Sequence, residues 1–244
     1  MRLCVIIPTY NNAGTLKQVV DGVCDYCRDI IVVNDGSTDA TSDILLQLPE
    51  TVDVVSYEQN KGKGHALVEG FCEACKRGFT HAITIDADGQ HFPADILHLV
   101  AACNSNSNGI IVGSRNLNEE NMPRQNTFAN KFSNFWFRIQ TGVNLPDTQS
   151  GYRLYSMSAL HGLALITSRY EAELELLVYA SWSGETISSV PVRVYYPPQE
   201  ERVSHFRPVY DFARISVLNT LLCLCAIIYG YPRMLCRTIK RLFR

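Results

Sequence analysis

Two aspartates at the end of a short apolar run give the clearest chemical signal in the sequence. The run Ile83-Thr84-Ile85 leads into Asp86 and Asp88, and Gln90 and His91 follow. Side chains alternate along a strand, so a strand that ends between the two aspartates lets both carboxylates converge on one ion. Hard oxygen ligands of this kind suit Mg²⁺ or Mn²⁺, which would then bridge a diphosphate. The alternative is a turn that merely favours Asp and Gly.

Three further polar clusters follow other predicted strands, at residues 9–12, 35–39 and 60–64. The carboxyl ends of parallel strands meet at one edge of a sheet, and open α/β sheets bind their ligands at that edge. The four clusters therefore predict a single site.

The elements that position this site alternate between β-rich runs and segments of helical period over residues 2–114, which predicts βαβ units and a mainly parallel sheet. The predicted strands are 3–8, 29–34, 52–57, 81–86 and 109–113, and the helices between them are 14–24, 38–48, 63–77 and 93–104. Ser37 is the predicted N-cap of the second helix, and Pro93 lies in the first turn of the fourth. Downstream we predict helices at 123–140, 156–164 and 170–182 and a strand-like run at 190–196.

Length and composition favour one catalytic domain with an appendage. The chain has 244 residues, 46% of them hydrophobic, and a net charge of -2, so one core is expected and no global basic field indicates nucleic acid. We predict a catalytic domain at 1–208, with a nucleotide-sugar half (1–114) and an acceptor half (115–208), and a membrane-associating helical segment at 209–244. The chain starts with a strand-like run and no signal-peptide pattern, so a cytosolic catalytic domain is expected.

Nine cysteines without an export signal favour free thiols over disulfides. The pairs Cys24/Cys27 and Cys72/Cys75 have C-x-x-C spacing and could together hold a zinc ion. Packing is the favoured interpretation, because both pairs fall in or beside predicted helices.

The ordered motifs resemble those of the family 2 glycosyltransferases, and within them the dolichyl-phosphate mannose synthase and polyprenyl-phosphate sugar synthase branch. They are IIPTYNN at 6–12, IVVNDGSTD at 31–39, NKGKG at 60–64, the D-x-D, GSR at 113–115 and SGYR at 150–153. The resemblance covers residues 2–200 and implies a single Rossmann-like (type A) transferase domain, an inverting reaction and a UDP- or GDP-sugar donor.

The resemblance also implies residue roles. Asp35 would accept hydrogen bonds from the nucleotide base, with Pro8 and Tyr10 against the ring. Asp88 would be the principal metal ligand, with Asp86 and Gln90 beside it. The implied nucleotide-sugar-binding set is Pro8, Tyr10, Asn12, Asp35, Lys63, Asp86, Arg115 and Arg124, of which the two arginines would face phosphate. The family often has acidic residues where this chain has Asn12 and Asn34, which leaves the nucleotide open.

The acceptor decides whether a base is needed. A lipid phosphate is already ionised, whereas a sugar hydroxyl of a growing envelope glycan requires a carboxylate base. Asp147, Glu171 and Glu173 are candidates, and Asp147 joins Asp88 and Arg115 in the predicted catalytic set, although it could equally order its loop. The segment 203–207 could close over the phosphates. A non-catalytic nucleotide-sugar-binding module and a sugar nucleotidyltransferase are the competing functions.

The tail predicts membrane association at the cytoplasmic face. The uncharged run 215–231 spans only about 25 Å, short of a hydrocarbon core of about 30 Å. Five basic residues follow it, on one face of a helix whose other face is apolar, which favours a helix that lies in the interface or re-enters it. A helix docked on the domain is the alternative. A second apolar stripe, Phe128, Phe132, Phe135 and Trp136, is predicted to face the core.

Overall fold

The structure is a computed structural model that describes residues 1–105, 109–116, 124–196 and 208–242. At several helix ends, residues 124–128 among them, the description is limited to the backbone. The predicted closing segment 203–207 lies outside the described residues.

The described residues form one seven-stranded sheet with the order β3-β2-β1-β4-β6-β5-β7. Neighbouring strands run parallel except around β6, which is antiparallel to both β4 and β5. The strands are β1 (Leu3–Thr9), β2 (Ile30–Asp35), β3 (Val52–Tyr57), β4 (His81–Thr84), β5 (Ile110–Ser114), β6 (Arg153–Ser156) and β7 (Ile187–Pro191). The predicted single α/β domain with a mainly parallel sheet is confirmed.

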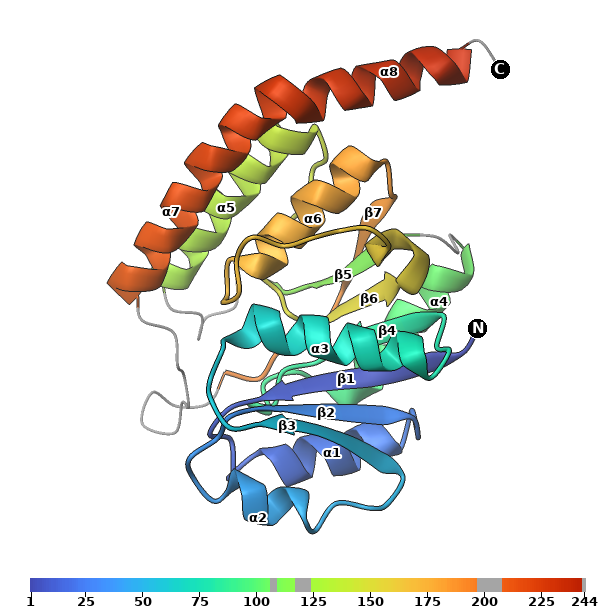
Figure 1. The fold of residues 1–244 in the computed structure, drawn as a ribbon, viewed down its shortest axis with the longest axis vertical. Coiled ribbons are helices and arrows are strands. Elements are labelled where there is room, and N and C mark those ends of the chain that lie inside the picture. The colour runs from blue at the N-terminus through green and yellow to red at the C-terminus, as the bar shows by residue number, and fades with distance from the viewer. Residues whose placement is uncertain (106–108, 117–123, 197–207, 243–244) are drawn as a thin grey trace.

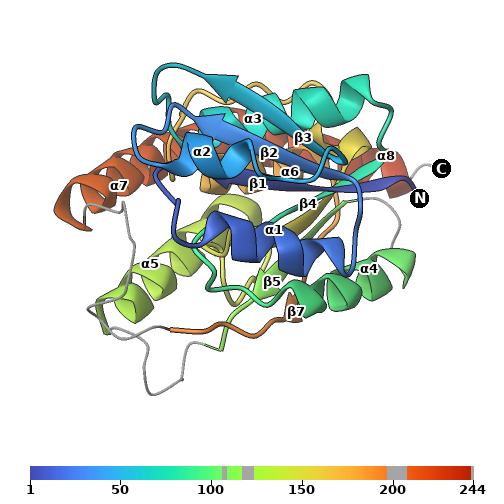
Figure 2. The same ribbon diagram turned by 90° about the horizontal axis from the view of Figure 1, so that it is seen from below.

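Helices cover both faces of the sheet (Figures 1 and 2). They are α1 (Leu16–Cys24), α2 (Thr41–Leu45), α3 (Lys63–Lys76), α4 (Ile96–Ser105), α5 (Arg124–Thr141) and α6 (Ala172–Ser183). Side chains of β1 alternate between two apolar clusters: Val5 and Ile7 pack with α1 and α4, whereas Cys4 and Ile6 pack on the side of α3 and α6. This alternation is the strand period of two applied to a sheet that is buried on both sides.

Three local predictions are wrong. Strand β6 was not predicted, and the helix expected at 156–164 is only a 3₁₀ turn, η2 (Met157–Leu160). All four residues of β6 are buried, so the strand carries no alternating pattern to reveal it. Helix α2 starts after Ala40 without a side-chain cap. Ser37 instead accepts a hydrogen bond at Oγ from the backbone N–H of Asn11, at 3.0 Å.

Two other predictions shift by a few residues. The strand predicted at 190–196 is observed as β7, which ends at Pro191, and beyond it only Val194 forms an isolated bridge, with His91. Pro93 begins a 3₁₀ turn, η1 (Pro93–Asp95), that leads directly into α4.

The C-terminal segment is one long helical rod that packs on α5 and α6 (Figure 1). Helix α7 (Pro208–Cys225) passes through a π-helical turn, η4 (Ala226–Gly230), into α8 (Tyr231–Leu242). The inner stripe of the rod is buried and consists of Ile215, Leu218, Asn219, Leu222 and Ala226. The stretch Ala213–Lys240 is 28 residues long, and an 18-residue window within it has a mean hydropathy of 1.7. By length and composition this helix is sufficient to cross a membrane, but it exceeds the uncharged run 215–231 only by including basic residues at both ends. The shortfall in length of the uncharged run therefore stays a prediction.

The apolar stripe predicted to face the core on α5 is also wrong. Phe135 is 57% exposed and Phe132 and Trp136 are half-buried, while the aromatic residue that reaches the core is Phe137. The inner face of α5 is otherwise polar and includes Asn130, Ser133 and Gln140. Helical period alone does not separate a core face from an exposed apolar face when both are present.

All nine cysteines are free. Cys72 and Cys75 are exposed on α3, whereas Cys24 and Cys27 are half-buried against the opposite cluster. Within the described ranges, no group of three or more His, Cys, Asp or Glu residues could hold a metal ion. The zinc alternative therefore finds no support.

Docking of the C-terminal rod can be tested with two adjacent leucines. Leu222 is 1% exposed and Leu221 is 53% exposed. Leu222→Ala should lower the free energy of unfolding by about 2–4 kcal/mol, because it removes buried apolar volume. Leu221→Ala should change it by less than about 1 kcal/mol. Chemical denaturation of both variants measures the difference, and equal effects would contradict a docked helix.

Candidate active site

The loops after β1 and β2 are locked together at the carboxyl edge of the sheet. Asn11 has a φ of 53°, and its Oδ1 accepts hydrogen bonds from the backbone N–H groups of Thr38 (2.7 Å) and Asp39 (3.3 Å). The backbone N–H of Asn12 donates to Oγ1 of Thr41 at 3.1 Å. The positive φ suits asparagine better than most residues. These contacts set the positions of Pro8, Tyr10 and Asn12 on this edge.

Asp35, at the end of β2, organises the loop before α3. It is 3% exposed, and its carboxylate accepts hydrogen bonds from Asn60 Nδ2 (2.9 Å) and from the backbone N–H groups of Lys61 (2.7 Å) and Gly62 (2.9 Å). Asp35 thus lies at the carboxyl edge where the site was predicted, but its carboxylate already accepts hydrogen bonds from groups of the protein.

Lys63, the first residue of α3, connects that loop to the D-x-D and to the start of α6. Its Nζ lies 2.7 Å from Oδ1 of Asp86 and 3.0 Å from Oε2 of Glu173, at the start of α6. Burial by itself would lower the pKa of Lys63, but these two carboxylates raise it well above its ordinary value. The ammonium is therefore permanently charged and crosslinks three elements of the fold.

The segment 150–153 packs directly on this ion pair. A Cβ on Gly151 would lie 2.6 Å from Nζ of Lys63 and 2.8 Å from Oδ2 of Asp86, so any side chain at this position would displace the ion pair. Arg153, fully buried, donates to the backbone oxygens of Ser150 (2.6 Å), Thr148 (2.9 Å) and Glu173 (2.8 Å). Arg153 is thus a structural residue that holds the segment against α6.

The D-x-D aspartates have opposite electrostatic environments. Burial by itself would raise the pKa of Asp86, but Lys63 and then His91 keep it below its ordinary value. Burial, followed by the negative charge of Asp86, raises the pKa of Asp88 to about 6. The only described partner of Asp88 is the backbone N–H of Gln90, which donates to Oδ1 at 2.9 Å. A buried carboxylate beside a second carboxylate is stabilised by an added cation.

His91 completes this edge of the site. Burial lowers its pKa to about 4, so the ring is neutral at pH 7. Its Nδ1 is buried and has no hydrogen-bond partner among the described residues, and the ring lies 5.0 Å from that of Tyr152. Asp86, Asp88 and the Gln90 amide fit a hard divalent cation, which needs few protein ligands when phosphate oxygens supply the others.

Arg115 and Asp147 form a second ion pair beside the first. Arg115 Nε and Nη2 donate to the two carboxylate oxygens of Asp147 at 2.6 and 3.0 Å. Asn130 and the backbone N–H groups of Arg115 and Gln149 donate to the same carboxylate. Burial by itself would raise the pKa of Asp147, but Arg115 keeps it low. A buried carboxylate with five donors and a low pKa is placed to orient Arg115 and is poorly placed to take a proton.

Arg124 is the first residue of α5, and its side chain lies outside the described part of the structure. Its predicted contact with phosphate stays a prediction.

Comparison with known proteins assigns the family. The sequence profile described as glycosyl transferase family 2 matches residues 4–163, which includes the D-x-D and the loops that carry Asp35, Lys63 and Arg115. The chain belongs to glycosyltransferase family 2.

Named relatives place this glycosyltransferase in the polyprenyl-phosphate sugar transferase branch. The UDP-N-acetylglucosamine–dolichyl-phosphate N-acetylglucosaminyltransferase of Methanococcus voltae is 35% identical over 213 residues, which cover 79% of this chain and 85% of that protein. The polyprenol monophosphomannose synthase of Mycolicibacterium smegmatis is 30% identical over 203 residues, covering 78% and 76%.

The fold is that of type A glycosyltransferases. The crystal structure of glucosyl-3-phosphoglycerate synthase from Mycobacterium tuberculosis, in complex with Mn²⁺, UDP-glucose and phosphoglyceric acid, matches with a TM-score of 0.66. It is 20% identical and covers 91% of this chain and 79% of that one. At this identity the likeness extends to the fold alone.

The structure brings together most of the predicted site and adds one connection. Asp86 and Lys63 meet at the carboxyl edge of the sheet, as expected for polar clusters that follow parallel strands, and the segment 150–153 packs against their ion pair. The ion pair between Lys63 and Glu173 was not predicted, although Glu173 was noted as a candidate base. Its signal in the sequence is a pair of glutamates in the first turn of a mainly apolar helix, Ala172–Ser183, since a buried acid needs a hydrogen-bonding or charged partner.

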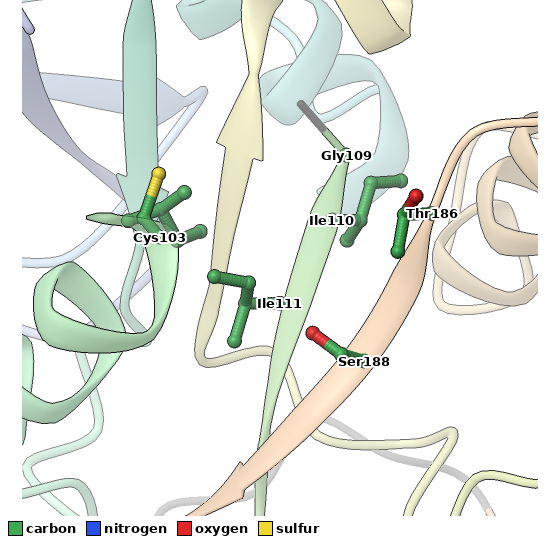
Figure 3. Close-up of a pocket in the computed structure, with 7 residues that line it drawn as sticks. Cys103, Gly109, Ile110, Ile111, Thr186 and Ser188 are labelled. Carbon is green, nitrogen blue, oxygen red and sulfur yellow. The ribbon is translucent and has the colours of Figure 1, made fainter. Parts of the chain in front are cut away.

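A hollow at the opposite edge of the sheet is unrelated to this site. It is lined by Cys103 of α4, by Ile110 and Ile111 of β5, and by Thr186 and Ser188, which lie just before and within β7 (Figure 3). Its lining carries no carboxylate, imidazole or basic group.

The raised pKa of Asp88 predicts a pH-dependent gain in stability for Asp88→Asn in the metal-free protein. Below pH 4, Asp88 is protonated in both the folded and unfolded states and contributes nothing. As the pH rises from 4 towards 6, the unfolded state ionises first, so wild-type stability falls relative to the variant. Above pH 6 the variant should be more stable by on the order of 1–3 kcal/mol.

Thermal denaturation in EDTA from pH 4 to 8 measures this difference. Added Mn²⁺ should stabilise the wild type and leave Asp88→Asn unchanged. A difference that is constant across the pH range would contradict the assigned environment of Asp88.

Proposed function

We propose that this glycosyltransferase moves a sugar from a UDP- or GDP-sugar to a polyprenyl phosphate, with inversion at the anomeric carbon and with Mn²⁺ or Mg²⁺. The observation that carries the proposal is the pair Asp86 and Asp88, one carboxylate held by Lys63 and the other with a pKa of about 6. The names of the relatives, which specify dolichyl phosphate and polyprenol, support the acceptor class.

Different residues of the site would contact different parts of the nucleotide-sugar donor. Pro8, Tyr10, Asn12 and Asp35 would hold the base and ribose, through the loops that β1 and β2 present. Asp86, Asp88 and Gln90 would hold the ion, which supplies charge stabilisation for the leaving diphosphate. Arg115, oriented by Asp147, and Arg124 would contact phosphate oxygens, a task that a planar guanidinium suits.

The interactions of the candidate bases support a lipid phosphate as the acceptor. Asp147 accepts five hydrogen bonds, and Glu171 is paired with Arg214 of α7. A lipid phosphate carries its own negative charge and can attack the anomeric carbon without a protein base. A sugar hydroxyl of an envelope glycan would need one, and all three candidates, Asp147, Glu171 and Glu173, are engaged in ion pairs.

The donor can be identified by nucleoside diphosphate release. A panel of UDP- and GDP-sugars with Mn²⁺ is assayed with and without a polyprenyl phosphate, for wild type, Asp88→Ala and Asp43→Ala. Wild type should release nucleotide with one donor when the acceptor is present. Asp88→Ala should lower the rate at least about 100-fold, as loss of charge stabilisation does, and Asp43→Ala, exposed on α2, should not.

Two results would point elsewhere. Tight nucleotide-sugar binding without turnover for any acceptor would favour a non-catalytic binding module. Release of pyrophosphate from a nucleoside triphosphate and a sugar phosphate would favour a nucleotidyltransferase.

We further propose that the enzyme lies on the cytoplasmic face of the membrane as a peripheral or monotopic protein. The outer side of the C-terminal rod exposes apolar residues at intervals of three or four, and the helix α5 beside it exposes Phe135 and Ile139. The exposed residues of the rod are Val217, Leu221, Leu224, Ile227, Ile228, Tyr229, Tyr231, Leu235 and Ile239. A surface of this extent is typical of lipid contact.

The basic residues at the end of α8 support the same orientation, because positive charge stays cytosolic and favours anionic lipid. The inner stripe of the rod is docked on the catalytic domain, which supports a helix that lies on the membrane over one that crosses it. Nucleotide-sugar donors would then reach the active site directly.

Membrane binding should depend on the outer side of the rod. A triple variant, Leu221→Gln, Ile228→Gln and Leu235→Gln, should lose most co-sedimentation with anionic liposomes, because it removes exposed apolar surface. A control triple variant changes Leu46, Leu97 and Ile166 to glutamine, which are 87%, 57% and 81% exposed elsewhere. The control should sediment as wild type does. Equal sedimentation of both triple variants would contradict the proposed surface.

A further inference from the structure

Three glutamates at the start of α6 are buried, and each has a different partner. Glu171 pairs with Arg214 of α7. Glu175 accepts hydrogen bonds at both carboxylate oxygens, from the backbone N–H groups of Ile166 (2.7 Å) and Thr167 (2.9 Å). Glu173 pairs with Lys63. Of the three, Glu173 is the one that reaches the active site.

The carboxylate of Glu173 is only half satisfied. Its Oε2 lies 3.0 Å from Nζ of Lys63, while its Oε1 is buried and has no hydrogen-bond partner among the described residues. The side chain is 7% exposed, so bulk water does not replace the missing donor. A buried acceptor without a donor is unfavourable, and native structures keep such groups mainly where a ligand or a bound water completes them.

The open oxygen is held at a defined place in the site. The same Nζ that contacts Glu173 also contacts Asp86, at 2.7 Å, so the two carboxylates share one ammonium. Arg153 donates to the backbone oxygen of Glu173 at 2.8 Å, which fixes the first turn of α6. Gly151 leaves no room for a side chain beside the ion pair.

The chemistry of this oxygen selects its ligand. An ionised carboxylate only accepts hydrogen bonds, and it repels phosphate. A diphosphate or a lipid phosphate is therefore a poor neighbour, and a neutral group that carries hydroxyl donors is a good one. In a nucleotide sugar those groups are the transferred sugar and the ribose. Since Asp86 is a predicted metal ligand at the diphosphate, the sugar lies nearer to Glu173 than the base does.

We infer that Oε1 of Glu173 accepts a hydrogen bond from a hydroxyl of the transferred sugar, so that Glu173 is a specificity-determining residue for the donor and does not act as the base. This inference rests on the proposed function. Lys63 holds the carboxylate in place, and the missing donor at Oε1 is supplied when the sugar binds.

The test compares a nucleotide sugar with the nucleoside diphosphate that lacks the sugar. Calorimetry with Mn²⁺ measures the affinities of the accepted donor and of its nucleoside diphosphate for wild type, Glu173→Gln and Glu171→Gln. Glu171 is the matched control, because it is a buried glutamate in the same helical turn with one cationic partner and one unpartnered oxygen. It faces α7 instead of the ion pair at Asp86.

We expect Glu173→Gln to reduce the affinity ratio of nucleotide sugar to nucleoside diphosphate by about 10-fold or more, as expected for a hydrogen bond to a charged group. Glu171→Gln should leave the ratio unchanged. A set of monodeoxy donor analogues should contain one that wild type binds about 10-fold more weakly than the parent and that Glu173→Gln binds as well as the parent.

Three results would overturn the inference while the proposed function stands. The first is an unchanged affinity of Glu173→Gln for both ligands. The second is an equal weakening of nucleoside diphosphate and nucleotide sugar, which would indicate a ribose contact or a structural role. The third is a loss of turnover with an unchanged ratio, which would indicate a base. If wild type binds no nucleotide sugar at all, the proposed function itself fails.

Discussion

The ammonium of Lys63, held between Asp86 and Glu173, is the contact on which the site depends. It joins the start of α3, the end of β4 and the start of α6, three elements that are far apart in the sequence. Removing one member would leave buried charges without a partner, which is strongly unfavourable. The glycine at 151 and the buried guanidinium of Arg153 belong to the same unit, because they bring the segment between α5 and β6 against the ion pair.

This arrangement separates the roles of two neighbouring carboxylates. Asp86 is neutralised within the protein, whereas Asp88 keeps a pKa of about 6 because burial and Asp86 oppose its ionisation. A half-buried carboxylate of this kind is stabilised by an added cation. Arg115 is held differently, since both of its donating nitrogens are oriented by the carboxylate of Asp147.

The C-terminal rod has two sides with different tasks. Its inner stripe packs on α5 and α6, and the indole N–H of Trp182 on α6 donates to the backbone oxygen of Gln140 on α5 at 2.8 Å. Arg214 connects the rod to Glu171, two residues from Glu173. The outer side is apolar and exposed. The inner side of the rod is therefore connected to the active site through the first turn of α6.

The sequence by itself determined the parallel part of the fold and the chemistry at its edge. The apolar runs in the sequence predict strands β1 to β5 and their approximate boundaries. The polar clusters after these strands were expected to lie together, because parallel strands end at one edge of a sheet. Strand β6 could not be read, because its pairing with β4 and β5 is non-local and its residues are buried on both faces. The exposed apolar face of α5 was wrongly predicted to face the core, because helical period does not show which apolar face the rest of the protein covers.

Only the tertiary structure decided which charges meet. Lys63 and Glu173 are 110 positions apart in the sequence, and no local pattern pairs them. The pairing of Arg115 with Asp147 likewise turns a candidate base into an orienting group. Local periodicity reports how each segment is buried, but the pKa and role of an ionisable group depend on neighbours that folding brings from elsewhere in the chain.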